Sequence, residues 1–210
     1  DTNNKLKGEV KITNTGANIV AITNSGGLSL GTSSVGTGTL TLTALGGDIT
    51  QSSSSAGFKQ TTGASAATFN AGANPITLTN AANDFTSTVT AIGTNVSLNG
   101  ANALTAVVNS IGTNVINGGG PLNISGTLTN LSSTATIGGN SITATSSNPA
   151  LISSVAVNYS SPASIGSLVF TSESNAVGTA VILGASMAKA APAFDGNWSV
   201  LIITTKGDCD

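Results

Sequence analysis

Short stretches in which aliphatic and small polar residues alternate recur along most of this 210-residue chain. Examples are Leu28-Ser29-Leu30, Leu40-Thr41-Leu42-Thr43, Ile76-Thr77-Leu78-Thr79 and Val96-Ser97-Leu98-Asn99. Alternation with a period of two places aliphatic side chains on one face of a strand and polar side chains on the other. Turn-forming pairs such as Gly-Gly, Asn-Gly and Asn-Pro separate the stretches. The chain is therefore predicted to be all-β.

These stretches also repeat with a spacing of about twenty positions. One series of equivalent positions runs Ile76, Val96, Val115 and Ile137; a second runs Phe85, Leu104, Leu122 or Ile124, and Ile142; a third begins at Val89 and Ile92 and continues through 107–111 to Leu128 and Leu131. A repeat of this length is typical of solenoid proteins. Three short strands per repeat predict a parallel β-helix, in which neighbouring coils lie about 4.8 Å apart.

The composition suits such a stack. Ser, Thr, Asn and Gly occupy 107 of the 210 positions, whereas charged residues make up 7%. Thr and Ser are compatible with the outer faces of strands, and Gly and Asn tolerate the left-handed backbone that corners need. Like charges stacked on successive coils would repel one another. The absence of charged residues between Asp84 and Glu173 is thus consistent with tightly stacked coils.

We expect the coils to occupy residues 1–159. From 160 the repeat fades and Phe, Trp, Met and Pro residues gather, so residues 160–210 are expected to form an atypical C-terminal cap, an anchor or a tail. The side chains expected to stack inside the coils are aliphatic or aromatic: Ile76, Leu78, Phe85, Val96, Leu98, Leu104, Leu122, Ile124 and Ile142.

The residue types that are missing exclude several kinds of site. The sequence contains no His and no Arg, because all six cations are Lys, and it contains one Cys. A His general base, a His-ligated metal, an Arg clamp and a Cys-built zinc site are therefore impossible. The net charge of −2, without a basic cluster, argues against nucleic acid as a partner. No stretch is long and apolar enough to span a membrane as a helix. We expect neither a metal nor a cofactor.

Part of the chain resembles the repeats of filamentous-haemagglutinin-like adhesins, which are large exoproteins of bacterial two-partner secretion. The most specific pieces are Gly46-Gly47-Asp48-Ile49-Thr50-Gln51 and Asn83-Asp84-Phe85; Leu40-Thr41-Leu42-Thr43-Ala44, Thr68-Phe69-Asn70-Ala71-Gly72 and residues 76–82 also match. The resemblance implies a right-handed parallel β-helix, passage through an outer-membrane transporter, and an extracellular location on the bacterial surface. It carries over no catalytic or binding residue.

From this resemblance we expect a non-enzymatic adhesin stalk, a stiff rod for adhesion to a host surface, a glycan or another matrix component, or for biofilm cohesion. The chain lacks the long amino-terminal secretion domain of such exoproteins, so we expect a fragment from toward the carboxyl end of a longer protein. Related exoproteins can be retained by a carboxyl-terminal cysteine pair. Here Cys209 is a single cysteine, for which an anchor, an intermolecular disulfide and an unpaired thiol stay open.

Two other functions stay open. The first is a self-assembling extracellular fibre subunit, in which coil ends stack on the next molecule. The second is a carbohydrate-binding or carbohydrate-active β-helix. Glycoside hydrolysis uses two carboxylates across a cleft, and Asp48 and Asp84 are the only carboxylates between Lys11 and Glu173. Each lies beside Gly or Asn, so we interpret both as turn residues and expect no enzyme.

Overall fold

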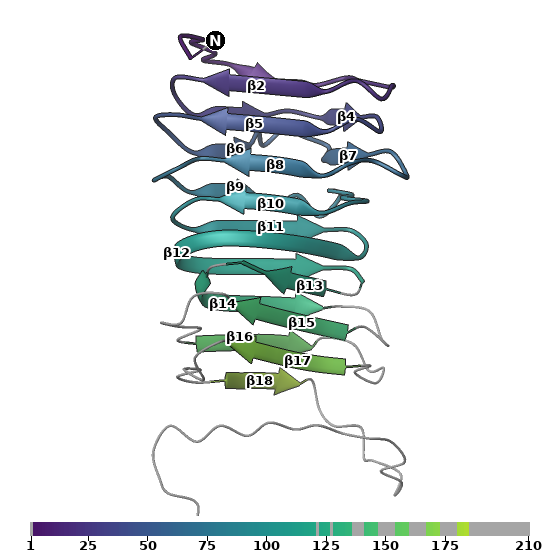
Figure 1. The fold of residues 1–210 in the computed structure, drawn as a ribbon, viewed down its shortest axis with the longest axis vertical. Coiled ribbons are helices and arrows are strands. Elements are labelled where there is room, and N and C mark those ends of the chain that lie inside the picture. Colours follow the sequence, from purple (N-terminus) through teal and green to yellow (C-terminus); the bar gives the residue numbers. More distant parts are fainter. Residues whose placement is uncertain are drawn as a thin grey trace, which may run out of the picture.

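The strands pair in parallel, and a strand inside the stack pairs with one strand of the preceding coil and one of the following coil. Figure 1 shows the resulting stack of rungs, which confirms the predicted all-β parallel solenoid. The fold is that of a computed structural model, which describes residues 2–120, 122–126, 128–135, 141–146, 154–159, 167–172 and 180–184, with side chains described as far as residue 126. Sixteen strands form one sheet and two form another.

The strands are short apart from one that turns a corner. They are β1 (Glu9–Val10), β2 (Val20–Asn24), β3 (Leu28–Leu30), β4 (Ser33–Val35), β5 (Leu40–Ala44), β6 (Ile49–Gln51), β7 (Phe58–Gln60), β8 (Ala67–Asn70), β9 (Ile76–Leu78), β10 (Val89–Ile92), β11 (Val96–Gly100), β12 (Leu104–Gly118), β13 (Leu122–Ser125), β14 (Leu128–Ala135), β15 (Ser141–Ser146), β16 (Ser154–Tyr159), β17 (Ser167–Ser172) and β18 (Ala180–Gly184).

Each coil contributes to two long sides, and some coils also contribute to a third. The first side contains β1, β3, β6, β9 and β11, and the second side contains β2, β5, β8 and β10. The long strand β12 serves both: its first residues pair with β13 on the second side, and its last residues pair with β14 on the first. A register shift between Ser110 and Thr113 marks the corner. The third side is the pair β4–β7, extended by isolated bridges.

The coils differ in length, which corrects the expectation of a constant repeat with three strands in every coil. On the first side, the step from Ile49 to its partner Ile76 is longer than the step from Leu28 to Ile49. The step from Val96 to its partner Asn114 is shorter than both. A short coil uses its length on the two long sides, so within the part of the chain that the structure describes only β4 and β7 form strands on the third side.

Coil shortening also moves the first predicted series of equivalent positions. Ile76 pairs with Val96 as expected, but Val96 then pairs with Asn114 and not with Val115. The buried residue in register with Leu98 is Ile116, and Val115 is paired with Ser97 on the outer face. Ile137, the last member of this series, lies outside the described residues.

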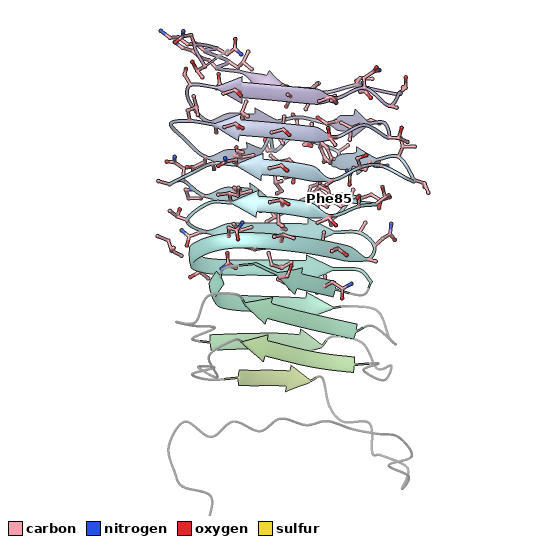
Figure 2. All side chains as sticks on the ribbon, viewed as in Figure 1. Phe85 is labelled. Carbon is pink, nitrogen blue, oxygen red and sulfur yellow. The ribbon has the colours of Figure 1, made fainter. Side chains whose placement is uncertain are left out.

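The second series is confirmed except at its first member. Leu104 pairs with Leu122, and Leu122 pairs with Ile142. Phe85 belongs elsewhere, since it follows the bridge between Lys59 and Asp84 on the third side. Figure 2 labels Phe85 within the stack, near this side.

The third series crosses from one side to another. Ile92 pairs with Asn109, inside the expected range 107–111, and Ser110 pairs with Leu128. Leu131, however, pairs with Asn114 on the first side. The start of this series lies on the same side as the second series: Val89 pairs with Ala106, and Ala106 belongs to β12, the strand that also contains Leu104. The predicted positions differ from the observed partners because the prediction assumed that all coils have the same length.

The side chains expected in the core lie inside the stack. Eight of the nine have exposed fractions of 3% or less: Ile76, Leu78, Phe85, Val96, Leu98, Leu104, Leu122 and Ile124. The ninth, Ile142, lies on β15 in register with Leu122, and its side chain is outside the described set. Three phenylalanines fill the wide coils, where Phe85 stacks on Phe58 at 5.6 Å between ring centroids and both meet Phe69 edge-on.

Coil strands continue beyond the boundary expected after residue 159. β17 pairs in parallel with β15, and β18 pairs in parallel with β16. The coils therefore reach Gly184, inside the segment 160–210 that was expected to be a cap. The step from Val155 to its partner Ala180 is longer than the repeat inferred from the sequence, so that repeat does not detect these strands. Residues 185–210, including Cys209, lie outside the described residues.

At the amino-terminal end of the stack, side chains connect several coils. The Glu9 side chain lies across Gly31, where any Cβ would collide with it, and its Oε2 accepts a hydrogen bond of 2.7 Å from Ser54 Oγ. Its Oε1 lies 3.0 Å from Lys11 Nζ. The side chains of Ser52, Ser54 and Lys11 hydrogen-bond the carboxylate and lower the pKa of Glu9 from 4.5 to about 2. Glu9 thereby links the first coil to the third.

The Glu9 connection predicts acid-sensitive stability. A carboxylate whose pKa falls on folding stabilises the protein above its unfolded-state pKa of 4.5, and this stabilisation is lost as pH falls toward about 2. Because the group is exposed, we expect a small effect. The Tm difference between the wild type and Glu9→Gln, measured by circular dichroism, should be constant above pH 4.5 and shrink toward zero by about pH 2. A difference that persists unchanged to pH 2 would contradict this role.

Candidate functional site

The third side presents a column of polar residues to solvent. β4 and β7 alternate, so that Ser33 and Val35 point inward while Ser34 is exposed, and Phe58 and Gln60 point inward while Lys59 is exposed. Ser34 pairs with Lys59, and isolated bridges join Thr13 to Ser34 and Lys59 to Asp84. Strand spacing sets these steps at about 4.8 Å. The register thus brings together residues that lie a full coil apart in the sequence.

The chain reaches β7 through a serine-rich loop, residues 52–57, that lengthens the third coil. Gly57 ends this loop with a φ of +110°, which L side chains rarely adopt, and a Cβ there would lie 2.8 Å from the carbonyl oxygen of Ala82 in the next coil. Gly57 is therefore required both by its conformation and by this close approach. The loop places Ala56 and Gly57 beside Thr32, whose Oγ1 accepts a hydrogen bond of 2.8 Å from Ala56 N.

Behind the loop, buried amides hold the corner in place. Asn83 is fully buried, and its Oδ1 accepts hydrogen bonds from Phe58 N at 2.9 Å and from Gln51 Nε2 at 2.7 Å. Its Nδ2 donates to Gln51 Oε1 and to Leu78 O, each at 3.0 Å. All of the hydrogen-bonding capacity of the Asn83 amide is therefore used, which buried polar groups require. This network fixes where β7 begins.

A hollow of about 240 Å³ opens to solvent at the upper part of the column. Its lining combines four residues that carry hydroxyls, one cation and an apolar floor: Thr13, Thr32, Ser33, Ser34, Ala56, Gly57 and Lys59. The buried Ser33 hydroxyl is engaged within the fold, since it donates to Gly31 O at 2.9 Å and accepts from Ile12 N at 3.2 Å. The exposed hydroxyls of Thr13 and Ser34 lie at the surface of the hollow, as does that of Thr32, which also accepts the hydrogen bond from Ala56 N.

The charge at the hollow comes from Lys59. Within the described residues, the ion pair between Lys11 and Glu9 is the only one, so the Lys59 ammonium makes no direct ion pair there. Asp84 lies one coil below Lys59, but its Oδ1 instead accepts a hydrogen bond of 3.0 Å from Asn102 Nδ2. The hollow therefore combines hydrogen-bonding hydroxyls with an available positive charge, which suits an anionic polar ligand.

The carboxylates that the sequence singled out do not meet. Asp48 precedes β6 at the start of the first side, whereas Asp84 lies on the third side. Asp48 takes part in the corner through its backbone carbonyl, which accepts a hydrogen bond from Leu28 N at 2.8 Å. Among the described residues, no group of three or more His, Cys, Asp or Glu side chains is placed to hold a metal ion.

Sequence reasoning missed the hollow and its lysine. The available signal was the isolation of Lys59, which is the only cation between Lys11 and Lys189. A lone lysine in a chain that avoids charge is notable, but its neighbours Thr13 and Ser34 become visible only with the register of the third side.

Comparison with known proteins shows that part of the chain is similar to repeats without an assigned function. A family model described as repeats of unknown function (DUF5649) matches residues 16–92, which include β2 through β10. No curated protein and no solved structure matches the chain. In the described portion, the structure contains no helix with the length and apolar character needed to cross a membrane.

Proposed function

We propose that the chain is a non-enzymatic stalk module of an extracellular bacterial adhesin, which serves attachment to surfaces or cohesion of a biofilm. The observation that carries this proposal is the parallel register, which links strands from β1 to β18 in one sixteen-stranded sheet. Hydrogen bonds between parallel strands run from coil to coil, so bending the stack requires many of them to be strained together. Such a solenoid is suited to holding a binding region away from the cell.

The resemblance to filamentous-haemagglutinin-like adhesins supports the same proposal. Its most specific pieces, residues 46–51 and 83–85, lie in the part of the chain that matches the repeat family. We propose secretion through an outer-membrane transporter and exposure at the bacterial surface. The outer faces support this too, because they carry Ser and Thr columns such as Thr41, Thr68 and Thr90, which tolerate water without requiring a fixed partner.

The proposal is tested in the bacterium that encodes the protein. An epitope tag inserted at Gly63, an exposed turn position, should be labelled by antibody on intact cells. In-frame deletion of the coding region for residues 16–92 should lower surface attachment or biofilm mass several-fold, without changing growth in suspension. Labelling only after cell lysis, or attachment that matches the wild type, would overturn the proposal.

Two further measurements separate the stalk from a fibre subunit and from a carbohydrate-active β-helix. Electron microscopy of the purified chain should show short particles of constant length over a concentration series. Filaments that lengthen with concentration would favour a fibre subunit instead. Release of reducing ends from a panel of acidic polysaccharides would favour an enzyme.

A further inference from the structure

We infer that the hollow on the third side binds a sugar unit that carries a carboxylate, such as a uronic acid residue of an acidic polysaccharide. The inference deepens the proposed adhesive function and rests on it for the kind of polymer presented to the protein. The binding chemistry itself follows from four features of the hollow: its size, its hydroxyls, its apolar floor and its lysine.

The size of the hollow selects a small ligand. Its volume of about 240 Å³ is below the range of roughly 300 to 1,000 Å³ that is typical of pockets for drug-sized molecules. It accommodates a single sugar ring better than a longer segment, and its opening to solvent allows the rest of a polymer to continue outside. A site of this kind is weak singly and gains avidity when a polymer presents many identical units.

The hydroxyls and the floor suit a sugar ring. A Ser or Thr hydroxyl can both donate and accept hydrogen bonds, as a sugar hydroxyl does. Thr13 presents such a group from one coil, and Ser34 presents another from the next coil. Thr32 adds an O–H donor, since its Oγ1 already accepts a hydrogen bond from Ala56 N. The Ala56 methyl group and Gly57 lie beside them and offer an apolar patch for the C–H face of the ring. This combination favours a polyol over a compact inorganic anion.

Lys59 selects a sugar that bears a negative charge. Its ammonium makes no ion pair among the described residues. Asp84 lies one coil below on the same column but does not line the hollow, and its Oδ1 accepts a hydrogen bond from Asn102 Nδ2. A hydrogen bond between an ammonium and a carboxylate is stronger than one between neutral groups. Phosphate and sulfate sites more often use Arg forks or several converging backbone N–H groups. One lysine among hydroxyls therefore fits a carboxylated sugar better.

The test compares two sugars that differ in one group. Galacturonate carries a carboxylate where galactose carries a hydroxymethyl group. Titration of the purified full chain, followed by amide chemical shifts, should give saturable shifts at residues 13, 32–34 and 56–59 with galacturonate. We expect a Kd on the order of 1 mM. Galactose should bind about tenfold more weakly, since a hydrogen bond to a charged group is lost.

Variants assign the binding to the hollow. Lys59→Gln should weaken galacturonate binding about tenfold while leaving galactose binding unchanged. Lys7→Gln, which removes an exposed lysine outside the hollow, is the matched control and should bind like the wild type. Because Lys59 is exposed, its replacement should leave the circular dichroism spectrum and Tm unchanged.

Three outcomes would overturn the inference: equal affinity for both sugars, unchanged galacturonate affinity in Lys59→Gln, or equally strong displacement by inorganic phosphate. None of them would affect the proposed stalk, which is tested by surface labelling and attachment. Conversely, if surface labelling and attachment failed while galacturonate still bound at the hollow, the stalk proposal would be overturned and the binding inference would be supported.

Discussion

Leu98→Asp is expected to destabilise the protein by at least about 5 kcal/mol, which approaches the whole stability of a small domain. Leu98 is fully buried on β11, directly between Leu78 of the preceding coil and Ile116 of the following coil. The substitution removes an aliphatic side chain from a packed column and places a carboxylate there without a partner. Urea unfolding, followed by circular dichroism, measures the change. Unfolding should spread to neighbouring coils, because each coil of a solenoid is stabilised by its neighbours.

Two companion variants make this result interpretable. Ser97→Asp introduces the same carboxylate one residue away, on the outer face between Thr77 and Val115, and should change the stability by about 0.5 kcal/mol or less. Leu98→Ala should fold and lose about 2 to 5 kcal/mol. Equal effects of Leu98→Asp and Ser97→Asp would mean that the two residues do not differ in burial, and would contradict the register of β11.

The solenoid could be predicted because its physical requirements are local and repeated. Alternation, as at residues 76–79, gives each strand an inner face, and recurrence of that pattern gives the stack. The same logic identified Leu98 and Leu122, which are buried as expected. What the sequence could not provide was the length of each coil, because that depends on how each corner is built.

The corner at residues 110–113 illustrates this point. A constant period placed Val115 inside, but the step from Val96 to its partner is shorter than that period, and Asn114 points inward instead. A buried asparagine is not expected from an aliphatic pattern. Its Nδ2 donates to Gly112 O at 3.1 Å, a local contact that exists only once the corner has formed.

The candidate site was beyond prediction for a related reason. Lys59 stands out in the sequence, yet a single lysine does not predict a binding site until the residues around it are known. Thr13 and Ser34 become its neighbours through strand pairing on the third side, which is present in only some of the described coils. A prediction of the site would have required the third side, and so the individual coil lengths.

The buried amide network gives the second large expected effect. Asn83→Ala should destabilise the protein by about 3 kcal/mol or more, because it removes the partners of Phe58 N and Leu78 O, which then remain in the interior without compensation. Asn102→Ala is the matched control, since Asn102 is exposed and its hydrogen bond reaches the Asp84 side chain. It should cost about 0.5 kcal/mol or less in the same urea titration. Hydrogen exchange adds a local readout: the Phe58 amide should lose protection in Asn83→Ala and keep it in Asn102→Ala. An Asn83→Ala protein as stable as Asn102→Ala would show that water replaces the amide without cost, and that the corner at Asn83 does not fix the start of β7.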